Sequence, residues 1–158
     1  MRAIDWDEGM SVGLARLDDD HKQLIAIINR LHEAVRLGGS EAGATVARSL
    51  QALADYTERH FAREEAVLEA VGYPALRGHR VQHDAFVDEL RDLADAFDAR
   101  RDPALAAELG RFLRDWLTHH ILVEDMAYKP RVQGDPRARA VAERFAGRGL
   151  ARSERAGA

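Results

Sequence analysis

The chain has no cysteine among its 158 residues. Disulfides, thiolate nucleophiles, iron–sulfur clusters and cysteine-based zinc sites are therefore excluded. Glycine and proline are scarce, at 12 and 4 residues, while 46% of the residues are hydrophobic, which is typical of a soluble and mostly helical protein. The length is sufficient for one domain with a hydrophobic core of its own.

Long apolar runs are also missing, and none approaches the roughly 18 residues that a membrane span requires. The N-terminus, from Met1 to Glu8, is acidic and lacks the apolar stretch of a secretory signal. We therefore expect no membrane span and a cytoplasmic location.

The net charge of −4 is unevenly distributed. Residues 1–128 carry 15 basic and 24 acidic side chains, whereas residues 129–158 carry 8 basic and 3 acidic ones. An acidic body argues against nucleic acid as a partner. We accordingly divide the chain into a body, 1–128, which begins with an arm over 1–16, and a basic extension, 129–158. The extension is expected to contain one short helix near 138–145 and then to be solvated and disordered.

Apolar residues recur at steps of three and four along most of the body, which predicts four amphipathic helices. The first is expected to begin at an N-cap within Asp18–Asp20 and to end at Gly38-Gly39, and the second to run from about Ser40 to Val71. The third is expected to follow Gly72-Tyr73-Pro74 and to end near Arg101. The fourth is expected to begin at Asp102-Pro103 and to end at Pro130. Short connections between such helices favour an all-α fold, an antiparallel up-down-up-down four-helix bundle with an N-terminal arm and a C-terminal extension.

Six polar side chains fall on the helix stripes that should face the core: His21, His60, Glu64, His79, His83 and His120. A single inward histidine is usually a core residue with a hydrogen-bond partner, but burying six such groups without partners would cost several kcal/mol each, of the order of ~2–7. Two of the pairs, His60 with Glu64 and His79 with His83, have the i,i+4 spacing of neighbours on one helix face. Metal binding is the simplest way to satisfy all six.

The number and type of these residues indicate which metal site to expect. A structural zinc site needs only about four ligands. Five imidazoles with carboxylates suit two first-row ions that share the carboxylates. The neutral donors favour Fe(II) over high-valent iron, and hence holding O2 over splitting it.

Four separated motifs then resemble the hemerythrins, and in particular their single-domain bacterial form, over about residues 6–128. The arm contributes Trp6 and Gly13. The motifs that follow are Leu17-Asp18-x-x-His21-Lys22-x-Leu24, Tyr56-x-x-x-His60-Phe61-x-x-Glu64-Glu65 with Gly72-Tyr73-Pro74, His79-x-x-x-His83, and Trp116-Leu117-x-x-His120-Ile121-x-x-x-Asp125-x-x-Tyr128.

The resemblance implies a reversible O2-binding centre with two iron ions. His79, His83 and His120 would bind one iron, and His21 and His60 would bind the other. Glu64, Asp125 and an oxygen derived from solvent would bridge both. O2 would bind at an open position on the iron with two histidines. Five apolar residues within one helical turn of these ligands could wall an O2 pocket: Leu24, Phe61, Trp116, Leu117 and Ile121.

One ligand is in dispute between helix geometry and the resemblance. Glu124 lies four residues after His120 and near the centre of its stripe, whereas Asp125 lies five residues after it and about 140° away on a regular helix. The family spacing selects Asp125, which we adopt, and this choice predicts a local distortion of the fourth helix.

Several other polar residues resemble ligands but have simpler interpretations. His119 is expected to be exposed, and His32 lies too far from His21 to share its metal. Lys22, Arg63 and Glu65 are interpreted as solvated surface charges.

The leading hypothesis is thus an O2-binding protein for storage, delivery or sensing, and not an enzyme. The alternative is a di-iron enzyme that acts on peroxide, nitric oxide or ferrous iron. A third possibility is a sensory or interaction module whose basic extension contacts a partner.

Overall fold

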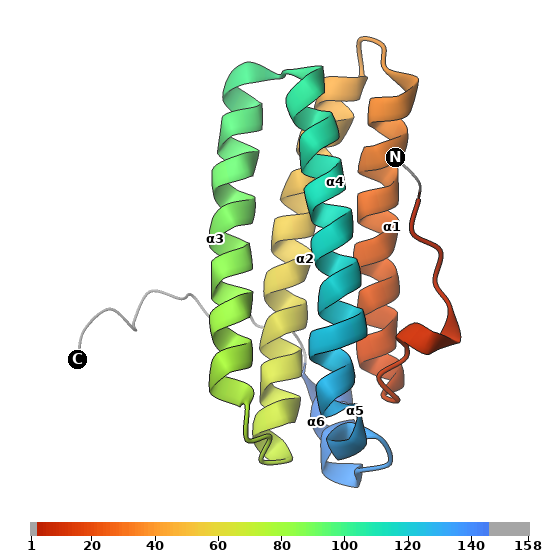
Figure 1. Ribbon diagram of the computed structural model, residues 1–158, viewed down its shortest axis with the longest axis vertical. Coiled ribbons are helices and arrows are strands. Elements are labelled where there is room, and N and C mark those ends of the chain that lie inside the picture. Colours follow the sequence, from red (N-terminus) through yellow and green to blue (C-terminus); the bar gives the residue numbers. More distant parts are fainter. Residues whose placement is uncertain (1–2, 146–158) are drawn as a thin grey trace, which may run out of the picture.

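Four long helices, α1 (Ala15–Leu37), α2 (Ala42–Ala70), α3 (Leu76–Arg100) and α4 (Pro103–His119), lie side by side in the computed structural model, which describes residues 3–145 (Figure 1). Successive helices run in opposite directions and are joined by short connections. The predicted all-α up-down-up-down bundle is confirmed. Within the described residues no helix is long and apolar enough to cross a membrane.

The first helix begins earlier than predicted, and the arm is joined to it by different contacts. A short 3₁₀ turn, η1 (Glu8–Met10), lies within the arm, and α1 begins at Ala15, ahead of the expected cap at Asp18–Asp20. Asp18 instead lies in the first turn of α1 and accepts hydrogen bonds from the Val12 backbone N–H at 2.9 Å and the Ser11 hydroxyl at 2.6 Å. Its carboxylate therefore ties the arm to the helix rather than starting the helix.

The start of α4 follows the prediction, because Asp102 caps it by accepting from the Ala104 N–H at 2.8 Å and Pro103 is its first residue. Its end does not. After His119 the chain continues through a π-helical turn, η2 (His120–Asp125), into α5 (Met126–Val132). The prediction that Pro130 closes the helix was wrong, since Pro130 lies inside α5. The chain turns only at Gly134, whose φ of +78° is strained for any residue with a Cβ.

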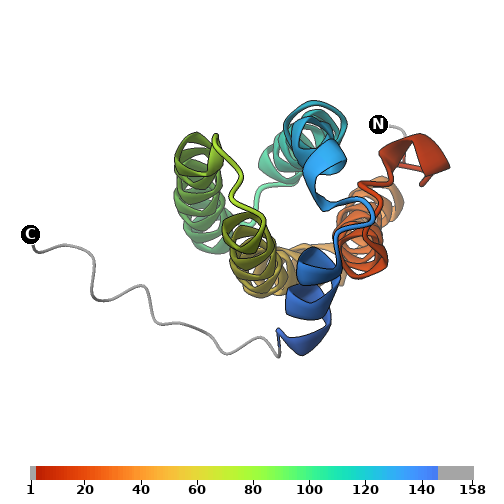
Figure 2. The same cartoon turned by 90° about the horizontal axis from the view of Figure 1, so that it is seen from below.

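A short helix, α6 (Pro136–Arg144), follows near the predicted 138–145, and Asp135 caps it by accepting from the Arg137 N–H at 2.7 Å. It packs against α2 and, to a lesser extent, α1, at the end of the bundle where α5 also lies (Figure 2). The disordered stretch expected after it, 146–158, lies outside the described residues.

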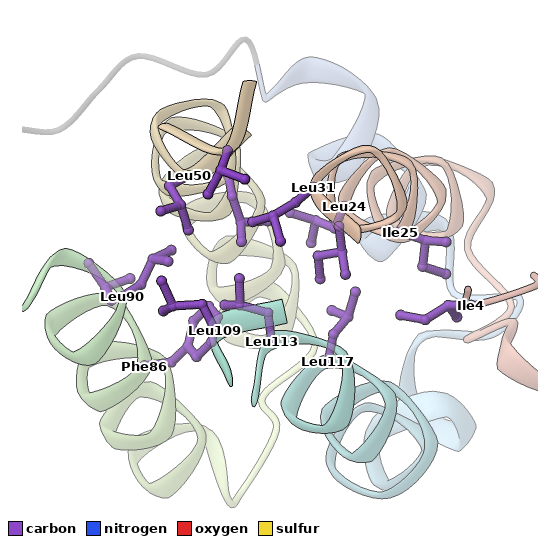
Figure 3. Close-up of a cluster of buried hydrophobic side chains, with 14 of the residues drawn as sticks. Ile4, Leu24, Ile25, Leu31, Leu50, Phe86, Leu90, Leu109, Leu113 and Leu117 are labelled. Atoms are coloured by element: carbon purple, nitrogen blue, oxygen red, sulfur yellow. The ribbon is translucent and has the colours of Figure 1, made fainter. Parts of the chain in front are cut away.

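The hydrophobic core has two parts. A larger cluster fills the bundle, and Figure 3 shows Leu24, Leu113 and Leu117 facing one another between α1 and α4. A smaller cluster joins Leu17, Val67 and Tyr128 with residues of α6 at the opposite end. Each fully buried aliphatic or aromatic side chain stabilises the fold by about 1.5–3 kcal/mol. Along each of α1, α2 and the α4–α5 segment, polar residues occupy the level between the two clusters.

Candidate metal centre

Seven polar side chains converge at this level between the two apolar clusters. Each is at most 4% exposed. They come from three of the long helices and the π-helical turn that follows α4: His21 on α1, His60 and Glu64 on α2, His79 and His83 on α3, and His120 and Asp125 on η2. The structure thus brings together all seven residues that the sequence singled out.

The π-helical turn determines which of Glu124 and Asp125 faces the interior. A π-helix closes its turns between residues five apart, so that residue i+5 returns to the face of residue i. Asp125 is therefore fully buried on the face of His120, whereas Glu124 points outwards and accepts from the Gln82 side-chain amide at 3.1 Å. The distortion that the choice of Asp125 required is present, in the form of this turn.

The seven residues form two overlapping groups. One contains Glu64, His79, His83 and His120, and the other His21, His60, Glu64 and Asp125, with the candidate ligand atoms of each group within 4.8 Å of one another. Both groups are buried throughout. Two groups that could each hold a cation thus share the carboxylate of Glu64 inside the bundle.

Glu64 directs one oxygen to each group. Its Oε1 lies 2.5 Å from His79 Nε2 and 3.3 Å from His83 Nε2, while its Oε2 lies 3.5 Å from His60 Nε2. The Tyr128 hydroxyl donates a hydrogen bond to Oε2 at 3.0 Å and fixes that oxygen.

Asp125 has the same divided arrangement. Its Oδ2 lies 3.2 Å from His21 Nε2, and its Oδ1 lies 3.1 Å from His120 Nε2 and 3.5 Å from His79 Nε2. Yet within residues 3–145 neither oxygen of Asp125 and neither ring nitrogen of His21 has a partner that meets the geometry of a hydrogen bond. Buried polar atoms left without partners are rare in folded proteins and call for an explanation, of which a bound cation is one.

The electrostatics of the centre favour anionic carboxylates. Burial and the neighbouring Glu64 would raise the pKa of Asp125, but His120 and His21 lower it to about 2. Burial would likewise raise the pKa of Glu64, but hydrogen bonds to His79 and His83 hold it well below its usual value. Two buried carboxylates that stay ionised require compensating positive charge.

The donor geometry also fits cations. Two nitrogen ligands that lie about 2.1 Å from one ion and at right angles to each other are about 3 Å apart. The Nε2 atoms of His83 and His120 face each other at 3.1 Å. All five histidines present Nε2 to a carboxylate oxygen, as a shared set of ligands would.

Two residues interpreted as solvated charges have partners on neighbouring helices, Glu65 on α3 and Arg63 on α1. Glu65, only 17% exposed, accepts from His83 Nδ1 at 2.9 Å and pairs with Arg80. Arg63 is buried and forms an ion pair with Asp20. Both interpretations were wrong because a position beside the stripe still meets a neighbouring helix. Lys22 is half-exposed, and His119 is exposed as predicted.

The sequence pattern indicated Asp20 only as part of a helix cap and did not reveal its contact with His60. It is fully buried on α1 and lies 3.4 Å from His60 Nδ1. Burial would raise the pKa of Asp20, but His60 and Arg63 lower it to about 2. Its position next to His21 in the sequence was the only signal available, and helix periodicity does not use it.

Apolar side chains cover the imidazoles. Phe61 stacks on His83 with ring centres 3.6 Å apart and planes 1° from parallel, and Trp116 stacks on His120 at 4.5 Å. The other three predicted pocket residues are buried in the same cluster: Leu24, Leu117 and Ile121.

Fold and site together define a helical bundle with a buried, histidine-rich group of side chains that could hold cations. The family Hemerythrin, described as the hemerythrin HHE cation binding domain, matches residues 12–132. The chain belongs to the hemerythrin family.

Known proteins support this assignment. A bacteriohemerythrin of Methylococcus capsulatus is 37% identical over 123 residues, which cover 77% of this chain and 88% of that protein. Another, of Stenotrophomonas maltophilia, is 32% identical over 133 residues and 84% of each chain. The crystal structure of a wild-type hemerythrin superposes with a TM-score of 0.72 at 29% identity, covering 84% of this chain and 99% of the other.

Proposed function

We propose that this protein binds O2 reversibly at a non-haem di-iron centre. The observation that carries the proposal is the pair of overlapping ligand groups, in which Glu64 and Asp125 each direct one oxygen to each side. A single ion would leave one of the two groups unused. Two ions satisfy both groups and neutralise the two buried carboxylates.

The ligands divide unequally. His79, His83 and His120 would hold one iron, and His21 and His60 would hold the other. Glu64 and Asp125, which each have one oxygen on either side, would serve both ions together with a solvent-derived oxygen. The side of His21 and His60 has one imidazole fewer, and O2 would bind on that side.

The chemistry that the two irons would supply is the transfer of two electrons to O2 on binding and their return to iron on release. The protein contributes a largely neutral imidazole set, which suits Fe(II), and a dry pocket. Leu24, Phe61 and Ile121 are at most 2% exposed, and Trp116 is half-buried. These side chains keep out water and protons, whose entry would expel oxygen as peroxide.

The physiological role is the storage, delivery or sensing of O2, without turnover of a substrate. The curated relatives bear the name bacteriohemerythrin, which supports an oxygen-related role for this chain. No nucleic acid partner is expected, and a cytoplasmic location stays a prediction.

One experiment tests the proposal. The purified protein is loaded anaerobically with ferrous iron, its metal content is measured, and its visible spectrum is followed through repeated cycles of aeration and evacuation. We expect about two irons per chain and a spectrum that returns to its starting form in each cycle. One tightly held zinc without a second metal would contradict the di-iron centre. Continuous O2 consumption with a reductant, without a stable aerated form, would favour the alternative of a di-iron enzyme.

A further inference from the structure

A buried ion pair lies beside the candidate metal centre but contributes to neither ligand group. It joins Asp20 on α1 to Arg63 on α2, and the two side chains are 0% and 6% exposed. Burying such a pair is costly unless additional hydrogen bonds satisfy it. Its position next to His60 suggests a role beyond stability.

The contacts of Asp20 are divided between its two oxygens. Oδ1 accepts a hydrogen bond from the Tyr56 hydroxyl at 2.9 Å. Oδ2 accepts from Arg63 and lies 3.4 Å from His60 Nδ1. A proton held on Nδ1 leaves Nε2 of His60 with its lone pair directed into the centre, which is the form that binds a metal. Asp20 is thus placed to hold a proton on Nδ1 and to orient the ring of His60.

Helix α6 covers the far side of this ion pair. Ala138 and Ala142 are buried in the same cluster as Val67, which lies one helical turn after Arg63. The Phe145 ring, at the end of α6, lies 5.8 Å from the Arg63 guanidinium. Figure 2 shows α6 crossing beside α2 and close to α1, the helices that carry Arg63 and Asp20.

The family match ends at residue 132, before α6 begins at Pro136. The helix that shields Arg63 is therefore an addition to the matched region. Without it, water would reach the guanidinium and weaken its hold on Asp20, because a charge pair is worth much less in water than in the protein interior.

We propose that Asp20 and Arg63 are positioning residues for His60, and that α6 keeps their ion pair dry so that the ion on the His21 and His60 side is retained. This inference rests on the proposed two-ion centre. It assigns the C-terminal helix a function in metal retention, in contrast to the basic extension, 129–158, expected from the sequence to be largely solvated.

The test follows the release of ferrous iron to a chromophoric chelator under anaerobic conditions. The variant Asp20→Asn removes the charge that orients His60, and Asp19→Asn, at a neighbouring position that is 62% exposed, is the matched control. Loss of an outer partner of a metal-bound histidine lowers metal affinity by about 10–100-fold. We expect one of the two irons to leave faster by about that factor while the other leaves at the wild-type rate. Equal acceleration of both irons would indicate general destabilisation and overturn the positioning role.

Asp20→Asn leaves Arg63 buried without its ionised partner and could impair folding. The double variant Asp20→Leu, Arg63→Met removes both charges, and replacing a buried ion pair by apolar side chains is often neutral or stabilising. We expect metal-free protein of this variant to melt near the wild-type temperature and still to lose one iron quickly. Retention of both irons at the wild-type rate would overturn the proposal.

The role of α6 is tested by Ala142→Glu, which places a charge at a position that is 1% exposed and separates α6 from α2. Arg139→Glu, on the exposed face of the same helix, is the control. We expect fast release of one iron in the first variant only. Wild-type release in Ala142→Glu would overturn the role of α6, whereas wild-type protein that never holds two irons would refute the proposed centre itself.

Discussion

His120 and Asp125 face each other, with Nε2 of His120 3.1 Å from Oδ1 of Asp125, although Asp125 lies five positions after His120 on the same helical segment. On a regular α-helix Asp125 would be rotated about 140° away from His120. The π-helical turn His120–Asp125 brings it back to the same face, and both side chains are buried. This single turn delivers a fourth-helix carboxylate to the middle of the bundle.

Substitutions at the two neighbouring acids should therefore have opposite outcomes. Asp125→Ala should lose iron, or the visible spectrum of the bridged centre, because it removes oxygens that face both ligand groups. Glu124→Ala should leave both nearly intact, since the Glu124 side chain is 32% exposed and contacts Gln82 and His119 at the surface. Iron content per chain is the measurement, and loss of iron from the Glu124 variant alone would refute the assignment.

Removal of metal should destabilise the protein. Without cations, His21 and Asp125 are buried with no hydrogen-bond partner in the described part of the chain, and ligands that bind only the folded state add to its stability. We expect a clearly lower Tm after anaerobic treatment with a chelator, and recovery when ferrous iron is restored. Equal melting temperatures in both states would mean that these side chains are not ligands.

Metal binding and metal-free stability should respond to pH in opposite directions. Burial would lower the pKa of His83, but Glu64 and Glu65 raise it to about 9 in the metal-free centre. Because its pKa is raised, protonated His83 stabilises the fold. This contribution is complete below the ordinary pKa of about 6.5 and is lost as the pH rises through about 9.

The free energy of unfolding of metal-free protein should therefore fall between pH 6.5 and 9, while metal affinity should rise because fewer protons compete. Burial would lower the pKa of His21, but Asp125 raises it above its ordinary value. The contribution of His21 to stability should therefore also fall as the pH rises. Adding ferrous iron near pH 7.5 in weak buffer should release protons, and a measurement of no release would contradict the protonated state of the free centre.

Opening the apolar wall should speed irreversible oxidation without removing iron. Leu24→Ala creates space one turn from His21, and a buried Leu→Ala change costs about 2–5 kcal/mol of stability. Leu53→Ala is the control, since Leu53 is equally buried in the same cluster but lies about two turns from His60. The measured quantity is the oxidation rate of the aerated protein at matched iron content. An equal rate in both variants would show that Leu24 serves packing only.

The sequence by itself determined the features that depend on local spacing. The i,i+4 pairs His60 with Glu64 and His79 with His83 follow from the helix period alone, and Asp102-Pro103 marks the start of α4 by its own cap chemistry. The bundle follows as well, because four amphipathic stripes joined by short connections have few other ways to bury their apolar faces.

Only the tertiary structure decided what lies beside those stripes. Arg63 and Glu65 flank Glu64 at angles that an isolated helix would leave in solvent, but α1 and α3 meet them there with Asp20 and His83. The π-helical turn and the docking of α6 belong to the same category, because hydrogen-bond register and helix packing respond to neighbours distant in sequence. Helix period reports which way a side chain points, but its surroundings depend on the helices packed against it.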